Sequence, residues 1–155
     1  MTDGFIGLNF ANDIITLLNG KWQSSGGAKP SFQTQWNMKN VGLGSRTYNQ
    51  VIISIDAENP QIYSLMQGDA TDATKFTYDW LHDVSISIDI RTSESELRVM
   101  QLVDEIMKIL KNNVVPTINN RTYIQMLPDG ITSLNEEYRN LYRYIISVSA
   151  MKLNP

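Results

Sequence analysis

The search for residues that could do chemistry begins with His82, because it is the only histidine in the chain and Asp83 follows it directly. A histidine beside a carboxylate can act as a general base, and a serine nucleophile would complete a triad. A single histidine cannot form a multi-histidine metal site. We interpret His82 as a polar residue at a strand edge. A catalytic His82–Asp83 pair remains the alternative, although the sequence displays no nucleophile, base and orienting residue together.

Two further patterns are similar to ligand sites but lack residues that such sites need. Ser24-Ser25-Gly26-Gly27 contains small residues, as a phosphate-binding loop does, yet it lacks the Gly-Lys-Ser/Thr ending of that motif. Asp69, Asp72 and Asp79 could bind calcium, but their spacing differs from an EF-hand loop and the closing glutamate is missing. The sequence therefore predicts a flexible loop at the glycines, no metal and no cofactor.

The composition excludes several other functions. The chain has no cysteine, so thiol catalysis and disulfides are ruled out. Its formal net charge of -3 argues against a surface that binds nucleic acid through clustered lysine and arginine. No apolar run reaches the roughly 18 residues of a membrane span. The 155 residues fit a single domain, 1–155, which is large enough to bury a core.

The best candidate contact surface consists of aromatic residues in loop-rich sequence, with arginines near them. Aromatic side chains in such places either cover a small core or anchor an interface. Singly they fit core cover, and as a group they fit an interface. Charged residues before the last strand fit either solvated charge or pairing between subunits. The predicted interface residues are Trp22, Phe32, Trp36, Arg46, Tyr48, Arg139 and Arg143.

The clearest pattern, over Asp83–Asn113, is a strand followed by a helix. Aliphatic and polar residues alternate from Val84 to Ile90, which is typical of a strand with one buried face. Ser93-Glu94-Ser95-Glu96 matches a capping box that would start the helix, and Asn112-Asn113 fits a left-handed stop. The apolar stripe of this helix consists of Val99, Val103, Ile106 and Leu110, widened by Met100 and Met107. The stripe predicts that one helix face packs on the sheet.

Other elements follow from shorter patterns. We expect a helix at Asn9–Asn19 that ends at Gly20. Asn59-Pro60 is expected to end one strand, and Pro128-Asp129-Gly130 to reverse another. Residues 60–79 fit either a short strand or a helical turn, with a polar loop after it. The further strands that we expect are Ser31–Met38, Val51–Ile55, Tyr123–Leu127 and Leu141–Ala150.

This order separates the helices from runs of consecutive strands. It favours an α+β fold with a mostly antiparallel sheet, two helices packed on one face, and long loops. The other sheet face carries serine, aspartate, arginine and scattered aliphatic residues, which suits either water or a partner surface. Since no catalytic set is present, an interaction role becomes the leading function class.

The chain also resembles the tail terminator, or tail-completion, proteins of long-tailed phages and archaeal tailed viruses. The resemblance is carried by the helix at Asn9–Leu18, the strand and helix over Val84–Leu110, and the closing strand Tyr142–Ala150. It covers most of the chain. It implies a non-enzymatic virion protein that forms a ring, typically hexameric, which terminates the tail tube and joins it to the head connector.

The resemblance also implies partners and a location. The expected partners are copies of the chain itself, the tail tube protein and the head-connector or neck proteins, while genomic DNA passes the lumen without specific binding. The expected location is the tail or neck of the virion, reached from the host cytoplasm during assembly, with no membrane involved. The alternatives are another neck or head-completion protein of the virion, and a non-viral small α+β binding module.

Overall fold

The computed structural model describes residues 5–37, 49–66, 77–135 and 141–154. Two α-helices and seven strands make up most of this part of the chain. The helices are α1 (Ile6–Lys21) and α2 (Glu96–Lys111), and two short 3-10 turns are η1 (Ser24–Gly26) and η2 (Gln35–Asn37). The strands are β1 (Ser31–Thr34), β2 (Asn49–Met66), β3 (Thr77–Thr92), β4 (Thr117–Ile118), β5 (Arg121–Thr122), β6 (Gln125–Ser133) and β7 (Tyr142–Asn154).

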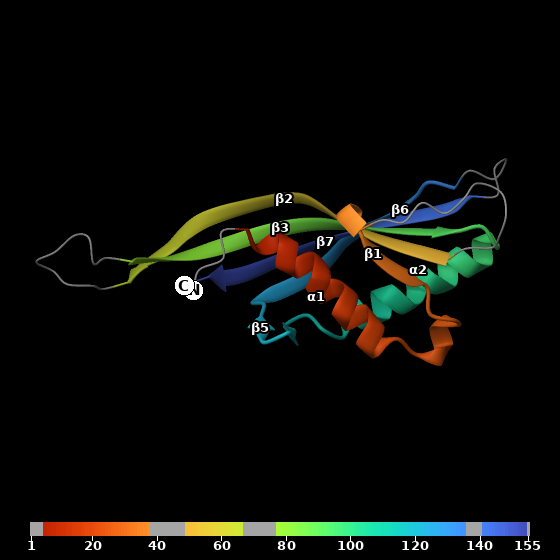
Figure 1. Ribbon diagram of the computed structural model, residues 1–155, viewed down its shortest axis with the longest axis horizontal. Helices are drawn as coiled ribbons and strands as arrows, with labels where there is room; N and C mark the ends of the chain where they lie inside the picture. The colour runs from red at the N-terminus through yellow and green to blue at the C-terminus, as the bar shows by residue number, and fades with distance from the viewer. Residues whose placement is uncertain (1–4, 38–48, 67–76, 136–140, 155) are drawn as a thin grey trace, which may run out of the picture.

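Five strands form the main sheet in the order β1-β2-β3-β7-β6, and β4 and β5 form a separate short hairpin. β1 runs parallel to β2, whereas the other three neighbouring pairs are antiparallel. β2 and β3 continue beyond the end of β7 and pair only with each other there (Figure 1). Both α-helices lie on one face of the sheet. The α+β prediction is therefore confirmed.

The hydrophobic core lies between the two helices and the sheet face that they cover. Every second residue of β3 from Val84 to Ile90 is buried, and these side chains contact both helices in one cluster. Tyr142, Tyr144, Ile146 and Val148 of β7 belong to this cluster or pack against it. Burying one aliphatic side chain contributes about 1.5–3 kcal/mol, so this single alternating pattern holds the two layers together.

The start of α2 differs from the predicted capping box, and its end differs from the predicted left-handed stop. Ser95 is the N-cap, and its hydroxyl accepts a hydrogen bond from the Arg98 amide at 3.1 Å. Thr92 accepts from the Glu94 amide just before the helix. The predicted left-handed stop is wrong, because Asn112 has helical dihedral angles. Neither described helix is long and apolar enough to span a membrane.

A residue far away in the sequence caps α1. Its N-cap, Phe5, has no side chain that can accept a hydrogen bond, so Glu58 of β2 takes this role. The Glu58 carboxylate accepts from the amides of Ile6 at 3.2 Å and Gly7 at 2.6 Å. A carboxylate at this end is also favoured by the helix dipole. The helix continues to Lys21, so the predicted end at Gly20 is wrong by one residue.

Two strands run through prolines that were expected to end or reverse them. β2 continues past Pro60 to Met66, because β3 is its only neighbour there among the described strands, and a strand with one open side tolerates proline. β6 continues past Pro128 as well, with a register shift before Gly130 instead of a reversal. A bulge absorbs the residue that cannot pair. The last strand is confirmed, with β3 and β6 on its two sides.

The carboxylate of Asp13 attaches the β4–β5 hairpin to α1. Asp13 is fully buried and accepts two hydrogen bonds from the Arg121 guanidinium, at 2.8 and 2.5 Å. Asn119 donates to it at 2.8 Å, and the Tyr123 hydroxyl donates as well. Burial and the Asp13 carboxylate raise the pKa of Tyr123 far above its ordinary value, so the phenol keeps its proton and remains a donor.

Replacing Asp13 by alanine should lower the free energy of unfolding by about 1–3 kcal/mol, because the buried hydroxyl of Tyr123 loses its acceptor. Urea denaturation at neutral pH measures the change. Asn12→Ala is the matched control, since Asn12 is the exposed neighbour in the same helix turn. Equal losses in the two variants would contradict the role assigned to Asp13.

Candidate interaction surfaces

The side chain of His82 contacts Glu58, and not its neighbour Asp83. Its Nδ1 lies 3.1 Å from the Glu58 carboxylate, and the ring is only 3% exposed. Because adjacent residues of a strand point to opposite faces, Asp83 lies on the other side of the sheet. His82 therefore helps to hold the carboxylate that caps α1. The predicted place at a strand edge is wrong, because His82 lies within β3 and pairs with Pro60 on one side and Lys152 on the other.

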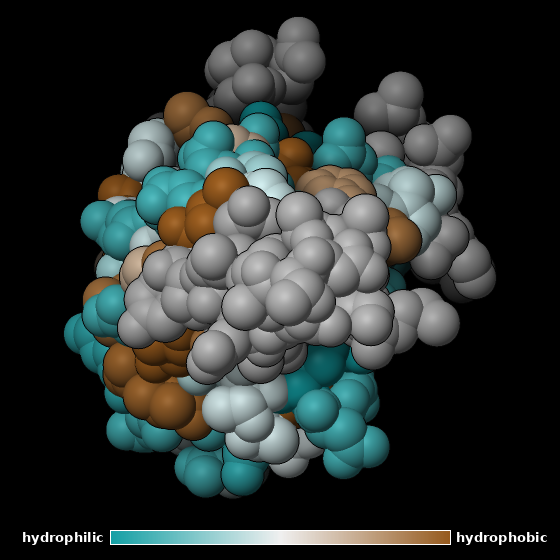
Figure 2. Space-filling view, turned by 90° about the vertical axis from the view of Figure 1, so that its left-hand side faces the viewer, coloured by the Kyte–Doolittle hydropathy of each residue, from teal (hydrophilic) through white to brown (hydrophobic). Residues whose placement is uncertain are grey.

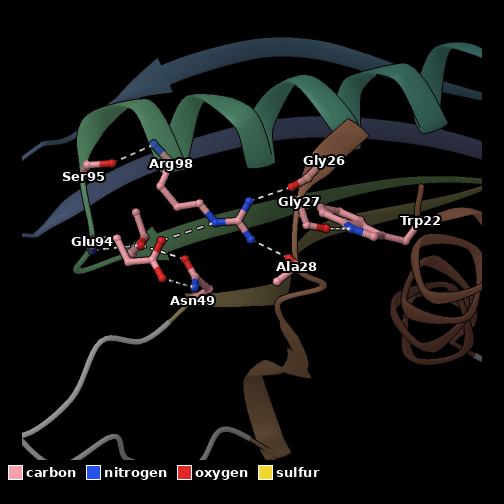
Figure 3. A network of polar contacts seen from close by, with 9 residues as sticks. Trp22, Gly26, Gly27, Ala28, Asn49, Glu94, Ser95 and Arg98 are labelled. Atoms are coloured by element: carbon pink, nitrogen blue, oxygen red, sulfur yellow. Dashed lines mark hydrogen bonds and ion pairs between the residues drawn. The ribbon is translucent and has the colours of Figure 1, made fainter. Parts of the chain in front are cut away.

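The glycine-rich loop is held by two charged residues of α2. Glu105, which is buried, accepts hydrogen bonds from the Gln23 amide at 3.0 Å and the Ser25 hydroxyl at 2.9 Å. Arg98 donates to the carbonyls of Gly26 at 2.6 Å and Ala28 at 2.5 Å. Figure 3 shows the Arg98 side chain extended from the helix to this loop, with Glu94 on its other side. The interactions leave no reason to assign a phosphate site here.

The two glycines permit this close approach. A Cβ on Gly26 would lie 2.6 Å from the Glu105 side chain, and one on Gly27 would lie 2.6 Å from Arg98 Nη1. Gly27 also has a φ of 74°, in the left-handed region that favours glycine. The predicted flexible loop is thus fixed to the helix layer by residues about 80 positions later in the chain.

The described residues contain no cluster of three or more histidine, cysteine, aspartate or glutamate side chains that could hold a metal ion. Asp69 and Asp72 of the calcium alternative lie outside the described residues, and the side chain of Asp79 does too. The absence of a metal stays a prediction.

The predicted interface residues that the structure describes lie at three separate places. Trp22 and Phe32 are half-buried and contact each other edge to face, with ring centroids 5.8 Å apart. Trp36, in η2, is 44% exposed. Arg143 lies on the uncovered sheet face. The remaining predicted residues, Arg46, Tyr48 and Arg139, lie outside the described residues.

Arg143 shares a buried carboxylate with Arg91. Asp89 accepts two hydrogen bonds from Arg143, at 2.9 and 2.8 Å, and two from Arg91, at 3.1 and 2.7 Å. Burial works to raise the pKa of Asp89, but the hydrogen bonds and charges of the two guanidinium groups outweigh it and hold the pKa below its ordinary value. The cluster places two half-exposed arginines side by side on the face that no helix covers.

An apolar groove lies between α2 and the edge strand β6. Its volume is about 330 Å³, and Asp104 and Lys111 stand beside the apolar residues. The apolar lining consists of Met100, Val103, Met107, Ile131 and Tyr144. Leu97 and Leu134 add exposed hydrophobic side chains on α2 and just after β6. Methionine side chains adapt to irregular partners, so this lining suits a protein contact.

The sequence contained a signal for this groove that the interface prediction missed. Met100 and Met107 widen the apolar stripe of α2: Met107 packs against the edge of the core, whereas Met100 is 50% exposed. The prediction also placed a reversal at Pro128–Gly130, which removed Ile131 from the sheet.

The paired ends of β2 and β3 form an arm that projects from the body (Figure 1). Ile62, at its base, is 59% exposed. Figure 2 shows the molecule from this end, with hydrophobic surface, in brown, mainly at the left of the view. Phe5 and Leu8 at the start of α1 are also exposed. A two-stranded ribbon is only marginally stable alone in water, so the arm is a second candidate contact surface.

Comparisons with known proteins give one finding on the fold. No family model matches the chain, and no curated protein matches it. A solved structure titled "Virion of native gene transfer agent (GTA) particle" contains a chain that superposes on this one with a TM-score of 0.53. The match covers 93% of this chain and 94% of that chain, at 13% sequence identity. The two chains share a fold. The similar chain belongs to a virion particle.

Asp89→Asn should reduce stability at pH 7 and flatten its pH dependence in acid. The folded-state pKa of Asp89 is lowered, so its carboxylate stabilises the fold above the unfolded pKa of about 3.9. That contribution is lost as the pH falls through the folded value. The free energy of unfolding, measured with urea at pH 7, 4 and 3, should fall less with decreasing pH in the variant than in the wild type. A drop of equal size would show that Asp89 is not the titrating group.

Arg98→Lys should loosen the glycine-rich loop, because a lysine ammonium cannot reproduce the forked guanidinium that donates to the carbonyls of Gly26 and Ala28. The amides of Gly26 and Gly27, which donate to Gln23 and Ser24, should exchange about tenfold faster with deuterium, equivalent to about 1.4 kcal/mol of opening free energy. Arg91→Lys, on the opposite sheet face, is the control. Unchanged exchange in Arg98→Lys would contradict the assignment.

Proposed function

We propose that the protein is a structural component of a virion, and that it forms a ring of six copies that terminates the tail tube and joins it to the head connector. The observation that carries the proposal is the fold shared, over nearly the whole length of both chains, with a chain of the gene transfer agent virion. The resemblance of its elements to tail terminator proteins supports the more specific role. No catalytic activity belongs to this proposal.

The surfaces of the chain suit a ring. Closed rings of identical subunits use heterologous contacts, in which two different surfaces of each copy meet. Here one edge strand of the sheet is β1 and the other is β6, and the apolar groove lies beside β6. Two unlike margins on opposite sides of one subunit meet this requirement.

Contacts along the ring axis require further surfaces. The arm of β2 and β3 projects away from both sheet margins, so it is available for the tail tube or connector proteins. A net charge of -3 lets DNA pass through a lumen without binding to its wall, because few cations are available to replace counterions. The protein would be found at the tail or neck of the virion after assembly in the host cytoplasm.

Mass photometry of the purified protein tests the ring directly. The expected mass is about six times the 17.6 kDa of one chain, and class averages from electron microscopy should show a closed ring. Antibody labelling of particles should mark the junction between head and tail. A protein that stays monomeric up to micromolar concentration and is missing from particles would overturn the proposal. Labelling elsewhere on the neck would favour the alternative of another neck or head-completion protein.

A further inference from the structure

The two outer strands of the sheet lie at the same level. Following the residue pairs across the sheet, Thr34 of β1 aligns with Ile131 of β6, and Gln33 aligns with Thr132. The residues between Thr34 and Ile131 are Ile53, Ile88 and Ile146. A second copy placed beside the first therefore brings its β1 next to this half of β6 without a shift along the strands.

The strand directions are also compatible. β1 is parallel to β2, and three antiparallel pairings then lead to β6, so β1 and β6 run in opposite directions. In two copies with the same orientation, β6 of one and β1 of the next form an antiparallel pair, which is the more stable arrangement per residue. The pairing also keeps side chains of the two copies on matching faces of the joined sheet, because Thr34 and Ile131 belong to one row of residues on the helix side.

Half of β6 has an open margin. At its beginning, the Met126 amide donates to the Val114 carbonyl at 2.7 Å, so the chain before β4 covers this part. Among the described residues, no other strand pairs with the outer side of Ile131–Ser133. Ile131 is 48% exposed, and the segments Ser31–Thr34 and Ile131–Leu134 contain no charged residue. Strand edges that must remain unpaired usually carry charges or proline.

We propose that β1 of one copy adds to the Ile131–Ser133 half of β6 in the next copy, so that the sheets continue from subunit to subunit around the ring. This inference rests on the proposed ring and names its lateral contact. The added strand of one copy places its Phe32 over the open end of the groove between α2 and β6 of the next copy. Trp36, which follows β1 directly, then lies beside the joint and loses exposure.

Engineered disulfides test this pairing in a chain that has no cysteine of its own. In the double variant Gln33→Cys with Thr132→Cys, the two new thiols of neighbouring copies face each other across an antiparallel pair, within the 4.4–6.8 Å Cα separation, roughly, that a disulfide needs. Mild oxidation should give a ladder of covalent multimers beyond the dimer on a denaturing gel, and reduction should collapse it.

The matched control is Gln33→Cys with Ser133→Cys, which moves one thiol to the opposite sheet face and should give no ladder. As a second measurement, Ile131→Asp should weaken self-association at least tenfold in mass photometry. Because Ile131 is exposed in the single chain, the circular dichroism spectrum and urea midpoint of the Ile131→Asp variant should stay close to those of the wild type.

The outcomes separate this inference from the proposed function. A wild-type multimer without a ladder, and with normal association of Ile131→Asp, would overturn the strand pairing and leave the ring intact. A ladder that stops at the dimer would overturn it as well, because a symmetric contact saturates with two copies. A monomeric wild type would overturn both proposals.

Discussion

The structure depends on one constraint: a single face of a five-stranded sheet is apolar, and both helices are needed to cover it. The aliphatic residues of β3 between Val84 and Ile90 are all buried on that face, while the residues between them reach the uncovered face. The core is therefore one layer thick, with helices on one side and a polar sheet surface on the other. A two-layer subunit of this kind has margins, and those margins are where its groove and outer strands lie.

Buried charges attach the irregular segments to this core. Glu58 caps a helix that has no cap of its own, Asp13 holds the β4–β5 hairpin, and Arg98 and Glu105 hold the glycine-rich loop. In each case one charged group forms hydrogen bonds with two or more polar groups of the segment that it holds. Charge-assisted hydrogen bonds are stronger than neutral ones, which suits segments that contribute few apolar side chains. The same residue types would suggest catalysis if they converged in a cleft, but here they lie at separate places and each is engaged with backbone or side-chain partners.

The exposed apolar surface has a different distribution. It gathers beside β6 and at the base of the arm, where the sheet extends beyond the helices. Edge strands and apolar patches that stay exposed to water usually carry charges, so this distribution marks the two places as candidate contact surfaces.

The sequence by itself determined the α+β class, the buried face of β3, the apolar stripe of α2 and the alternating pattern of β7, because each follows from local periodicity in the chain. Only the tertiary structure decided where prolines interrupt pairing: Pro60 and Pro128 stay within strands since each lies where the strand has an open side or a bulge. Tertiary structure also decided the partners of the charged residues, because Glu58, Asp13 and Arg98 bind groups about 50 to 110 positions away. The groove required both the widened stripe of α2 and the continuation of β6 past Gly130, and the second of these depends on neighbouring strands that no local pattern reveals.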